Sequence, residues 1–220
     1  MTHPNHLLRP LLTVALIGLV ACHPGPEVAE STIGIQPYGA VDPALLDTLQ
    51  ATLERVYAPA HVVILPSVEL PASAFIEVKS PRYRADSLIA QQTRHRPDSI
   101  DFVLGVLNRD ISTTKRDPHG AVLDPAWKYA DWGVFGLGYR PGVSCVVSTF
   151  RVGSVSKRLF MERMKKIAVH EVGHNLGLPH CTAGGRCVMR DAAESIRTID
   201  RVDLALCDRC KSRIAPTLDP

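Results

Sequence analysis

The chain has 220 residues, 45% of them hydrophobic and 21% charged, which is typical of a globular protein rather than a disordered or fibrous one. The 25 Lys and Arg residues against 22 Asp and Glu give a net charge of +3, too small an excess for a nucleic-acid-binding protein. No apolar run reaches the roughly 20 residues of a membrane-spanning helix, so an integral membrane protein is excluded. One feature is unusual: four of the six cysteines lie within the last 40 residues.

The first residues have the pattern of an export signal. Arg9 precedes the apolar run 11–20, LLTVALIGLV, and small residues follow this run. A positively charged start, a short apolar stretch and small residues at a cleavage site are typical of a secretory signal peptide. The apolar run is too short for a helix that crosses a bilayer. We therefore expect a signal peptide over residues 1–21, the alternative being an uncleaved anchor or a buried strand.

The tetrapeptide Leu-Val-Ala-Cys at 19–22 resembles a bacterial lipobox, in which the cysteine is lipidated and becomes the first residue of the mature protein. We therefore expect lipid attachment at Cys22, followed by a Pro-rich polar tether over 22–30. This resemblance implies an exported, membrane-anchored lipoprotein of the cell envelope. Because His23 rather than Asp follows the cysteine, we expect the outer membrane, facing the periplasm, if the cell has two membranes.

Signals for strands and helices alternate after the tether, with neither an internal repeat nor a linker, so we expect one domain over 31–220. Runs rich in β-branched and apolar residues predict strands at 32–36, 61–65, 101–107 and 143–148. We expect 75–78 to extend the hairpin or ladder of 61–65. Apolar residues at helical spacing predict helices at 43–56, 84–92, 157–175 and 196–214, the first of them capped by Asp42.

Residues 108–132 contain few periodic apolar residues. Irregular segments of this length in a compact domain are usually functional or mobile. Trp127 and Trp132 either pack this segment against the domain or line a substrate cleft, and we expect packing. Cys145, inside the apolar run 143–148, is expected to be a buried, unpaired thiol.

The strongest motif reads HEVGHNLGLPH and begins at His170. His174 is four residues further on, so on a helix both imidazoles project from one face and can share a zinc ion. Glu171 is rotated by about 100° around the helix axis, from where it can reach a water molecule at the metal without being a ligand. Gly177 can adopt the left-handed conformation that ends a helix, which lets His180 return as a third ligand. Three protein ligands leave one position for water, as in a catalytic zinc site.

The order of helix, glycine and third histidine is typical of the metzincin group of zinc peptidases. The second mark of that group is a methionine turn beneath the zinc. Met189, nine residues after His180, is placed for this role. Surface histidines on an amphipathic helix are the alternative for the motif, and a core methionine is the alternative for Met189.

Four cysteines surround and follow this methionine: Cys181, Cys187, Cys207 and Cys210. A Cys-x-x-Cys pair near the start of a helix commonly gives two thiolates to one zinc, and the first two cysteines can supply the other pair. A closed four-thiolate site is structural. In an oxidising compartment the pairs Cys181–Cys187 and Cys207–Cys210 could instead form disulfides, although we expect zinc. Because the third histidine and the first cysteine are neighbours, about 3.8 Å apart at Cα, the two metals must lie close together.

The run of HEVGHNLGLPHC, CVM and CDRC resembles the archaemetzincins, as do FGLGY at 135–139 and VVSTFR at 146–151. The resemblance covers about residues 31–214 and is strongest from 134 onward. It implies an α+β, metzincin or zincin-like single domain: a twisted mixed β-sheet with an antiparallel edge strand, packed against an active-site helix and a C-terminal helix. It also implies two zinc ions per chain, one catalytic and one structural. The spacer between Cys181 and Cys187 has five residues where four are usual, which affects a loop and not the ligand types.

The expected function is therefore zinc-dependent hydrolysis of a peptide or protein substrate, with Glu171 as the general base. The likeness of FGLGY to the family's edge strand implies that an extended substrate pairs with Phe135, Gly136, Leu137 and Gly138. The alternatives are a lipid-anchored zinc-binding or scaffold protein with little or no turnover, and a zinc storage or delivery protein. The intact Glu171 favours the enzyme. We expect a monomer that binds no nucleic acid.

Overall fold

The structure, a computed structural model, describes residues 30–153, 156–190 and 195–218. The predicted signal peptide and Cys22 lie outside the described residues, as does the tether except for its last residue, Glu30. Of the helices within the described ranges, none combines the length and the apolar character that crossing a membrane would require.

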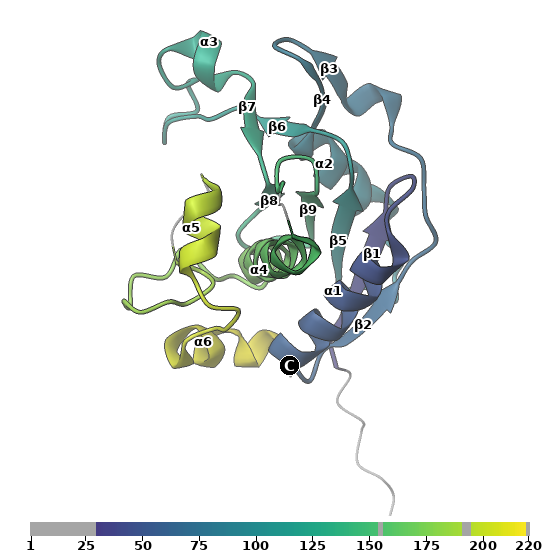
Figure 1. Ribbon diagram of the computed structural model, residues 1–220, viewed down its shortest axis with the longest axis vertical. Coiled ribbons are helices and arrows are strands. Elements are labelled where there is room, and N and C mark those ends of the chain that lie inside the picture. Colours follow the sequence, from purple (N-terminus) through teal and green to yellow (C-terminus); the bar gives the residue numbers. More distant parts are fainter. Residues whose placement is uncertain (1–29, 154–155, 191–194, 219–220) are drawn as a thin grey trace, which may run out of the picture.

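A five-stranded sheet forms the centre of the domain (Figure 1), with strand order β2-β1-β5-β9-β8. The first four strands run parallel, and β8 pairs antiparallel with β9 at the edge of the sheet. The expected mixed sheet with an antiparallel edge strand is therefore confirmed. The bounds are β1 Thr32–Pro37, β2 His61–Ile64, β5 Phe102–Leu107, β8 Gly136–Gly138 and β9 Ser144–Ser148.

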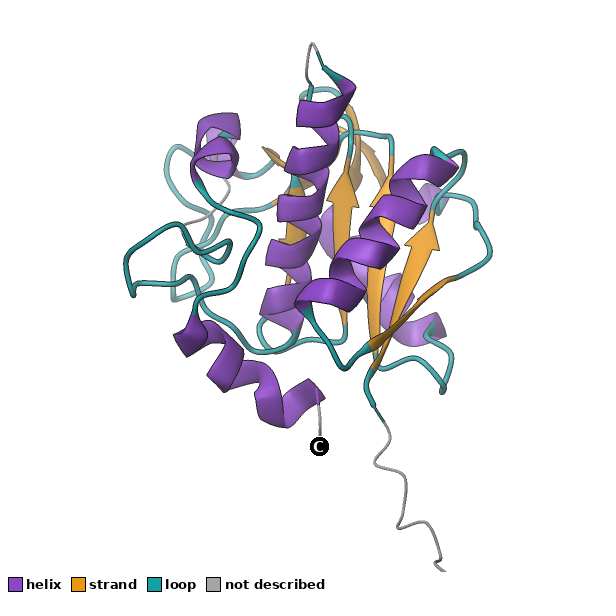
Figure 2. Ribbon diagram, turned by 60° about the horizontal axis from the view of Figure 1, so that its bottom comes forward, coloured by secondary structure: helices purple, strands orange, loops and turns teal. Residues whose placement is uncertain are grey.

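Helices cover both faces of this sheet. Helices α1 (Pro43–Val56) and α4 (Lys157–Asn175) lie side by side on one face (Figure 2), and α2 (Ala85–His95) packs against the other. Successive side chains of β9 alternate between these two layers, so that Cys145 belongs to the α1–α4 core and Val146 to the α2 core. Cys145 is fully buried and free, as predicted.

A second, four-stranded sheet of order β3-β4-β6-β7 was not predicted. The expectation that 75–78 extends the ladder of 61–65 is wrong, because β3 pairs with β4 in this second sheet while β2 pairs with β1 in the first. Residues 108–132 are likewise more ordered than expected, since they contain β6 and the short helix α3. The bounds are η1 Ala72–Ala74, β3 Phe75–Glu77, β4 Pro81–Arg84, β6 Ile111–Thr113, α3 Ala126–Tyr129 and β7 Trp132–Val134.

The helix predicted over 196–214 is in fact two helices, α5 (Ile196–Arg201) and α6 (Asp208–Leu218). The residues between them leave the helical conformation to pair with the loop that carries Cys187. The N–H of Asp203 donates to the carbonyl of Arg186 at 2.6 Å, and the N–H of Val188 donates to the carbonyl of Ala205 at 2.9 Å. These bonds replace the helical ones that the break removes.

Candidate metal centre and catalytic cleft

The three motif histidines meet at the end of α4. His170 and His174 lie on the last turns of the helix, and their Nε2 atoms are 3.0 Å apart. His180 comes from the segment after the helix, and one ring nitrogen from each of the three residues lies within 4.8 Å of the others. Two nitrogens at about 2.05 Å from a tetrahedral zinc are about 3.3 Å apart, so this donor set fits a zinc ion.

The turn after α4 is what returns His180 to the helix. Gly177 has φ +91°, the left-handed conformation predicted for it. Its N–H donates to the carbonyl of His174 at 2.9 Å, and the N–H of Leu178 donates to the carbonyl of Gly173 at 2.9 Å. This pair of bonds is the Schellman arrangement, which satisfies the last carbonyls of the helix and reverses the chain.

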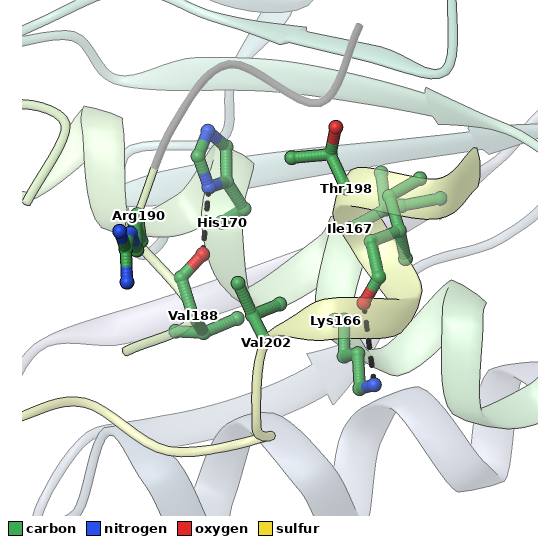
Figure 3. Close-up of a pocket in the computed structure, with 8 residues that line it drawn as sticks. Lys166, Ile167, His170, Val188, Arg190, Thr198 and Val202 are labelled. Carbon is green, nitrogen blue, oxygen red and sulfur yellow. Dashed lines mark hydrogen bonds between the residues drawn. The ribbon is translucent and has the colours of Figure 1, made fainter. Parts of the chain in front are cut away.

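The two helical histidines are oriented by backbone carbonyls. Nδ1 of His170 lies 2.9 Å from the carbonyl oxygen of Val188 (Figure 3), and Nδ1 of His174 lies 2.8 Å from that of Leu178. When Nδ1–H donates to a carbonyl, Nε2 is the unprotonated nitrogen that can bind a metal. Burial and the neighbouring His174 lower the pKa of His170 to about 3, which keeps its imidazole in the neutral, metal-binding form.

Glu171 is buried between the histidine cluster and the edge strand β8. A Cβ atom on Gly136 would lie 2.7 Å from Cγ of Glu171, and one on Gly138 would lie 2.6 Å from its main-chain oxygen. Glycine at both positions therefore allows α4 to approach β8 this closely. Burial raises the pKa of Glu171 to about 8, and the backbone of Gly138 opposes that shift. A cation held by the histidines would also oppose it, by favouring the carboxylate.

Met189 is fully buried and packs against α4 at Gly173. A Cβ atom on Gly173 would lie 2.5 Å from its sulfur and 3.0 Å from the hydroxyl of Tyr57. That hydroxyl donates a 2.5 Å hydrogen bond to the carbonyl of Val169. Tyr57 and Gly173, neither of which was singled out from the sequence, thus fix the contact between Met189 and the helix.

The four cysteines form a second cluster, with sulfurs within 4.8 Å of one another. Sγ of Cys181 lies 3.6 Å from Sγ of Cys207, and Sγ of Cys187 lies 3.8 Å from Sγ of Cys210. Four sulfurs at about 2.3 Å from a tetrahedral zinc are about 3.8 Å apart, whereas a disulfide requires about 2.05 Å. The cysteines are free, and both of these pairs join the two segments. The cluster therefore fits a zinc ion.

Backbone hydrogen bonds to sulfur partly offset the effect of burial on the thiols of this cluster. The N–H of Cys207 donates to Sγ of Cys187 at 3.4 Å. The backbone N–H of Cys210 lowers the pKa of Cys207 to about 7, while burial raises the pKa of Cys187 and of Cys210. Cys207 is also the most exposed of the four.

The two clusters share one short piece of chain. Cys181 directly follows His180, and its N–H donates to the carbonyl of Met189 at 2.7 Å. The histidine cluster opens onto a cleft of about 230 Å³, whereas three of the four cysteines are buried. The residues around this cleft come from both sheets, from α4 and from two connecting segments, and they are Lys115, Trp132, Gly133, Val134, Gly136, Leu137, Gly138, His170, Glu171, His174 and His180.

The predicted substrate strand borders this cleft at three of its four residues, Gly136, Leu137 and Gly138. Phe135 lies at the bend between β7 and β8 and packs against the α1–α4 core, while its carbonyl accepts a 2.8 Å bond from the N–H of Ser148. Asn175 is a further residue that the sequence did not indicate. Its Nδ2 donates to the carbonyls of Tyr139 at 3.1 Å and Ser144 at 3.0 Å, which fastens the end of α4 to the sheet.

Comparison with known proteins gives concordant matches. The model of peptidase family M54 matches residues 28–215. Archaemetzincin of Halobacterium salinarum is 31% identical over an alignment of 191 residues that covers 83% of this chain and 98% of the relative. Archaemetzincin of Archaeoglobus fulgidus is 30% identical over 182 residues, again 83% of this chain and 98% of the relative.

Solved structures agree with this fold. The crystal structure of archaemetzincin from Archaeoglobus fulgidus complexed with malonate has 29% identity and a TM-score of 0.64, covering 83% of this chain and 99% of its own. Archaemetzincin from Methanopyrus kandleri has 24% identity and a TM-score of 0.70, covering 87% and 97%, and it supports the fold alone. The chain therefore belongs to peptidase family M54, the archaemetzincins, and is a zinc metallopeptidase.

Proposed function

We propose that the chain hydrolyses peptide bonds with Glu171 as general base and with His170, His174 and His180 as the ligands of the catalytic zinc. The observation that carries this proposal is the position of Glu171. Its buried carboxyl group lies between three convergent imidazoles and β8, which is the last strand of its sheet among the described residues. Zinc on the three imidazoles would polarise the scissile carbonyl and acidify the attacking water.

The edge strand β8 supplies the means of holding a substrate. Its pairing with β9 uses one side of the strand, and it is the last strand of the sheet. An extended peptide can add to such an edge through main-chain hydrogen bonds, which hold the substrate whatever its sequence. The scissile bond would then lie beside Glu171, since both glycines of β8 contact that residue.

Glu171 then transfers the proton between the reacting groups. Its carboxylate accepts the proton of the attacking water and delivers it to the amine of the leaving fragment. Both transfers require a carboxylate within hydrogen-bonding reach of the scissile bond. The contact with Gly136 restricts the side chain on one side and keeps it pointed at the cleft.

We propose that a second zinc is bound by Cys181, Cys187, Cys207 and Cys210 and is structural. The separations between their sulfurs support this assignment, as does the burial of the cluster away from the cleft. Its effect would be to hold the segment that begins at Cys181, and therefore His180, against α6. The chain would then carry two zinc ions.

The variant Glu171→Gln tests the catalytic assignment. The amide cannot accept a proton, so kcat for a peptide substrate should fall by about 10²- to 10⁴-fold while zinc content and the unfolding midpoint are retained. Glu162→Gln is the matched control, because Glu162 lies on the same helix and pairs with Lys165 instead. Undiminished hydrolysis by Glu171→Gln would contradict the role of Glu171 as general base.

We also propose that the chain is exported and anchored by lipid at Cys22, in the outer membrane facing the periplasm where the cell has two membranes. The lipobox-like sequence at 19–22 supports this location. We propose in addition that the chain is a monomer. Mass spectrometry of the mature N-terminus should show an acylated Cys22. The Cys22→Ala variant should no longer be found in the membrane fraction. An unmodified N-terminus would contradict the anchor.

A further inference from the structure

A second edge strand borders the cleft beside β8. The three residues of β7, Trp132, Gly133 and Val134, all line the cleft. Among the described residues β7 pairs only with β6 and is the last strand of its sheet, as β8 is of the other sheet. Two edge strands therefore follow one another along the chain, joined only by Phe135 (Figure 1). A peptide paired with β8 could continue along β7.

The spacing along the chain sets how far such a peptide would extend. Gly136 lies against Glu171, the proposed base. Trp132 precedes Gly136 by four residues, which is about 13 Å of extended chain. Contacts with the start of β7 would therefore lie several residues from the scissile bond, and only a substrate long enough to reach β7 could make them.

The start of β7 is packed in an aromatic stack. Trp132 stacks on Tyr129, with ring centroids 5.3 Å apart and planes inclined by 25°, and Nζ of Lys115 lies 4.5 Å from the centre of the Trp132 ring. Trp132 was expected either to pack or to line a cleft, and it does both. Trp127 is 75% exposed and does not line the cleft, so neither expectation holds for it.

The middle of β7 packs against Arg151, which follows β9. A Cβ atom on Gly133 would lie 2.7 Å from Nε of Arg151 and closer still to the rest of the guanidinium group. This group therefore lies directly against the main chain of β7. Because Arg151 comes three residues after the end of β9, the contact connects β7 to the sheet that contains β8.

Asp110 keeps this guanidinium group from moving aside. Its two carboxylate oxygens accept from Nε and Nη2 of Arg151 at 2.5 and 2.7 Å, a bidentate pairing. Asp110 also accepts from Nε of Arg82 at 2.9 Å, and Nη1 of Arg82 lies 3.1 Å from the carboxylate of Asp131, the residue before β7. Two arginines that hold the start and the middle of β7 thus converge on one carboxylate, which is only 6% exposed.

We propose that β7 continues the peptide-binding edge of β8, and that Arg151 and Asp110 are positioning residues that hold β7 beside the cleft. Neither residue lines the cleft, so neither would touch the substrate. This inference rests on the peptidase reaction proposed above and narrows its substrate class to extended chains that reach about four residues from the scissile bond. Binding along β7 would use main-chain hydrogen bonds, whatever the sequence of that part of the substrate.

Peptides of different length test this edge. A short peptide with two residues on each side of the scissile bond is compared with the same peptide extended by four Ala or Ser residues at one end or the other. For one of the two extensions, kcat/KM of the wild type should rise about five- to thirtyfold, mainly through KM, which corresponds to one or two net hydrogen bonds. N-methylation of the added amides should remove the gain. The proposal fails if neither extension gives a gain, or if the gain survives N-methylation.

Arg151→Met tests the positioning role, because it removes the guanidinium group and keeps an unbranched side chain. The gain from extension should be lost through a higher KM, while kcat and KM for the short peptide change less than twofold. Asp110→Asn should act in the same way. Asp200→Asn is the matched control, since Asp200 makes the same bidentate pairing with Arg163 and neither of these two lines the cleft. A gain retained in Arg151→Met, or lost equally in Asp200→Asn, would overturn the role.

Gly133→Ala tests the contact between β7 and Arg151. In the wild type the new Cβ should displace either β7 or the guanidinium group and cancel the gain from extension. In the Arg151→Met background the flexible side chain can move aside, so that the second substitution should add little. The two substitutions should therefore be non-additive. Additive losses would show that Arg151 does not act through this contact.

A binding measurement separates the edge from the reaction on which it rests. Calorimetric titration of the full-length zinc-loaded Glu171→Gln variant, alone and combined with Arg151→Met, gives Kd for the short and long peptides without turnover. We expect tighter binding of the long peptide only when Arg151 is present. If the wild type cleaves none of the peptides, the proposed function fails, and this titration still decides the edge: equal Kd values for the two peptides in Glu171→Gln would refute it.

Discussion

The histidine cluster and the cysteine cluster are joined by a single peptide bond, yet the chain builds them in different ways. The histidines come from 11 consecutive residues, two on one face of α4 and the third beyond the turn at Gly177. The cysteines come from two segments that other structure separates, so that Cys181 meets Cys207 only when the domain is folded. A ligand set of the first kind depends on local geometry, and one of the second kind depends on the whole C-terminal region.

The two clusters also differ in their exposure to solvent. The histidines face a cleft that a substrate can enter, whereas the cysteines are packed among residues of the α1–α4 core. A metal in the open site is available for chemistry, and a metal in the closed site can contribute only to stability. The two clusters should therefore respond oppositely to the loss of one ligand, activity being lost at the first and stability at the second.

The largest effect on stability should come from Cys210→Ser, compared with His174→Ala. Loss of a structural metal lowers the free energy of unfolding by about 4 kcal/mol or more, so denaturant unfolding of Cys210→Ser should show a much lower midpoint. His174→Ala should lose hydrolysis and change the midpoint far less. Each variant should retain one zinc. A Cys210→Ser midpoint equal to that of His174→Ala would mean that the clusters do not divide the two roles.

A smaller and more selective effect is expected at the two glycines of β8. In Gly138→Ala the new Cβ meets a main-chain oxygen, which cannot move away, so the unfolding free energy should fall by about 1–3 kcal/mol.

In Gly136→Ala the new Cβ meets the side chain of Glu171, which can rotate. We expect kcat to fall by about tenfold, equivalent to about 1.4 kcal/mol, with little loss of stability. Unfolding curves and peptide kinetics of both variants measure the contrast. Both should keep the cysteine-bound zinc, and its loss from either would show that the cysteine cluster depends on the cleft.

The smallest effect on stability is expected for an ion pair that joins α4 to α5. Arg163 on α4 donates to both carboxylate oxygens of Asp200 on α5, at 2.8 and 2.7 Å. Hydrogen bonding to Arg163 lowers the pKa of Asp200 below its ordinary value. Because Asp200 is 36% exposed, Asp200→Asn should cost only about 0.5–1 kcal/mol at neutral pH.

The sign of the pH dependence follows from that lowered pKa. The contribution of this ion pair to the free energy of unfolding is complete above the unfolded-state pKa of Asp200, about 3.9. It is lost as the pH falls through the lower pKa of the folded state. Unfolding of the wild type and Asp200→Asn should therefore converge below about pH 4. Asp203→Asn is the control, since Asp203 and its partner Arg186 are both more than half exposed. If the free energies of unfolding of the wild type and Asp200→Asn differed by the same amount down to pH 2, the ion pair would not be the cause of the difference.

The comparison of the clusters also explains which parts of the fold were predictable. Helix α4 was predicted with its correct bounds because its apolar spacing, its turn at Gly177 and its histidines are all local signals. The break between α5 and α6 was missed because it depends on bonds from Asp203 and Ala205 to a loop almost 20 residues earlier. No local pattern encodes those partners.

The cleft also combines local sequence signals with contacts that form only in the folded protein. The zinc ligands and Glu171 could be proposed from spacing, but Gly136 and Gly138 matter only because α4 lies against them. The short strands of the second sheet lack a periodic apolar pattern, so neither they nor the stack of Lys115, Trp132 and Tyr129 could be anticipated. Those contacts become visible only when the two sheets are placed side by side.

The glycines of β8 have a consequence for how this enzyme can diversify. The helix behind β8 excludes a side chain at 138 and leaves room for one at 136 only if Glu171 moves, so a peptide that paired with this strand would meet mainly main-chain groups, which are the same for every peptide. Selectivity would then depend on the other residues that line the cleft, of which Lys115 and Trp132 belong to the segment 108–132. That segment contributes no ligand to either metal cluster. Substitutions there can change which proteins are cut while the machinery for cutting is left intact.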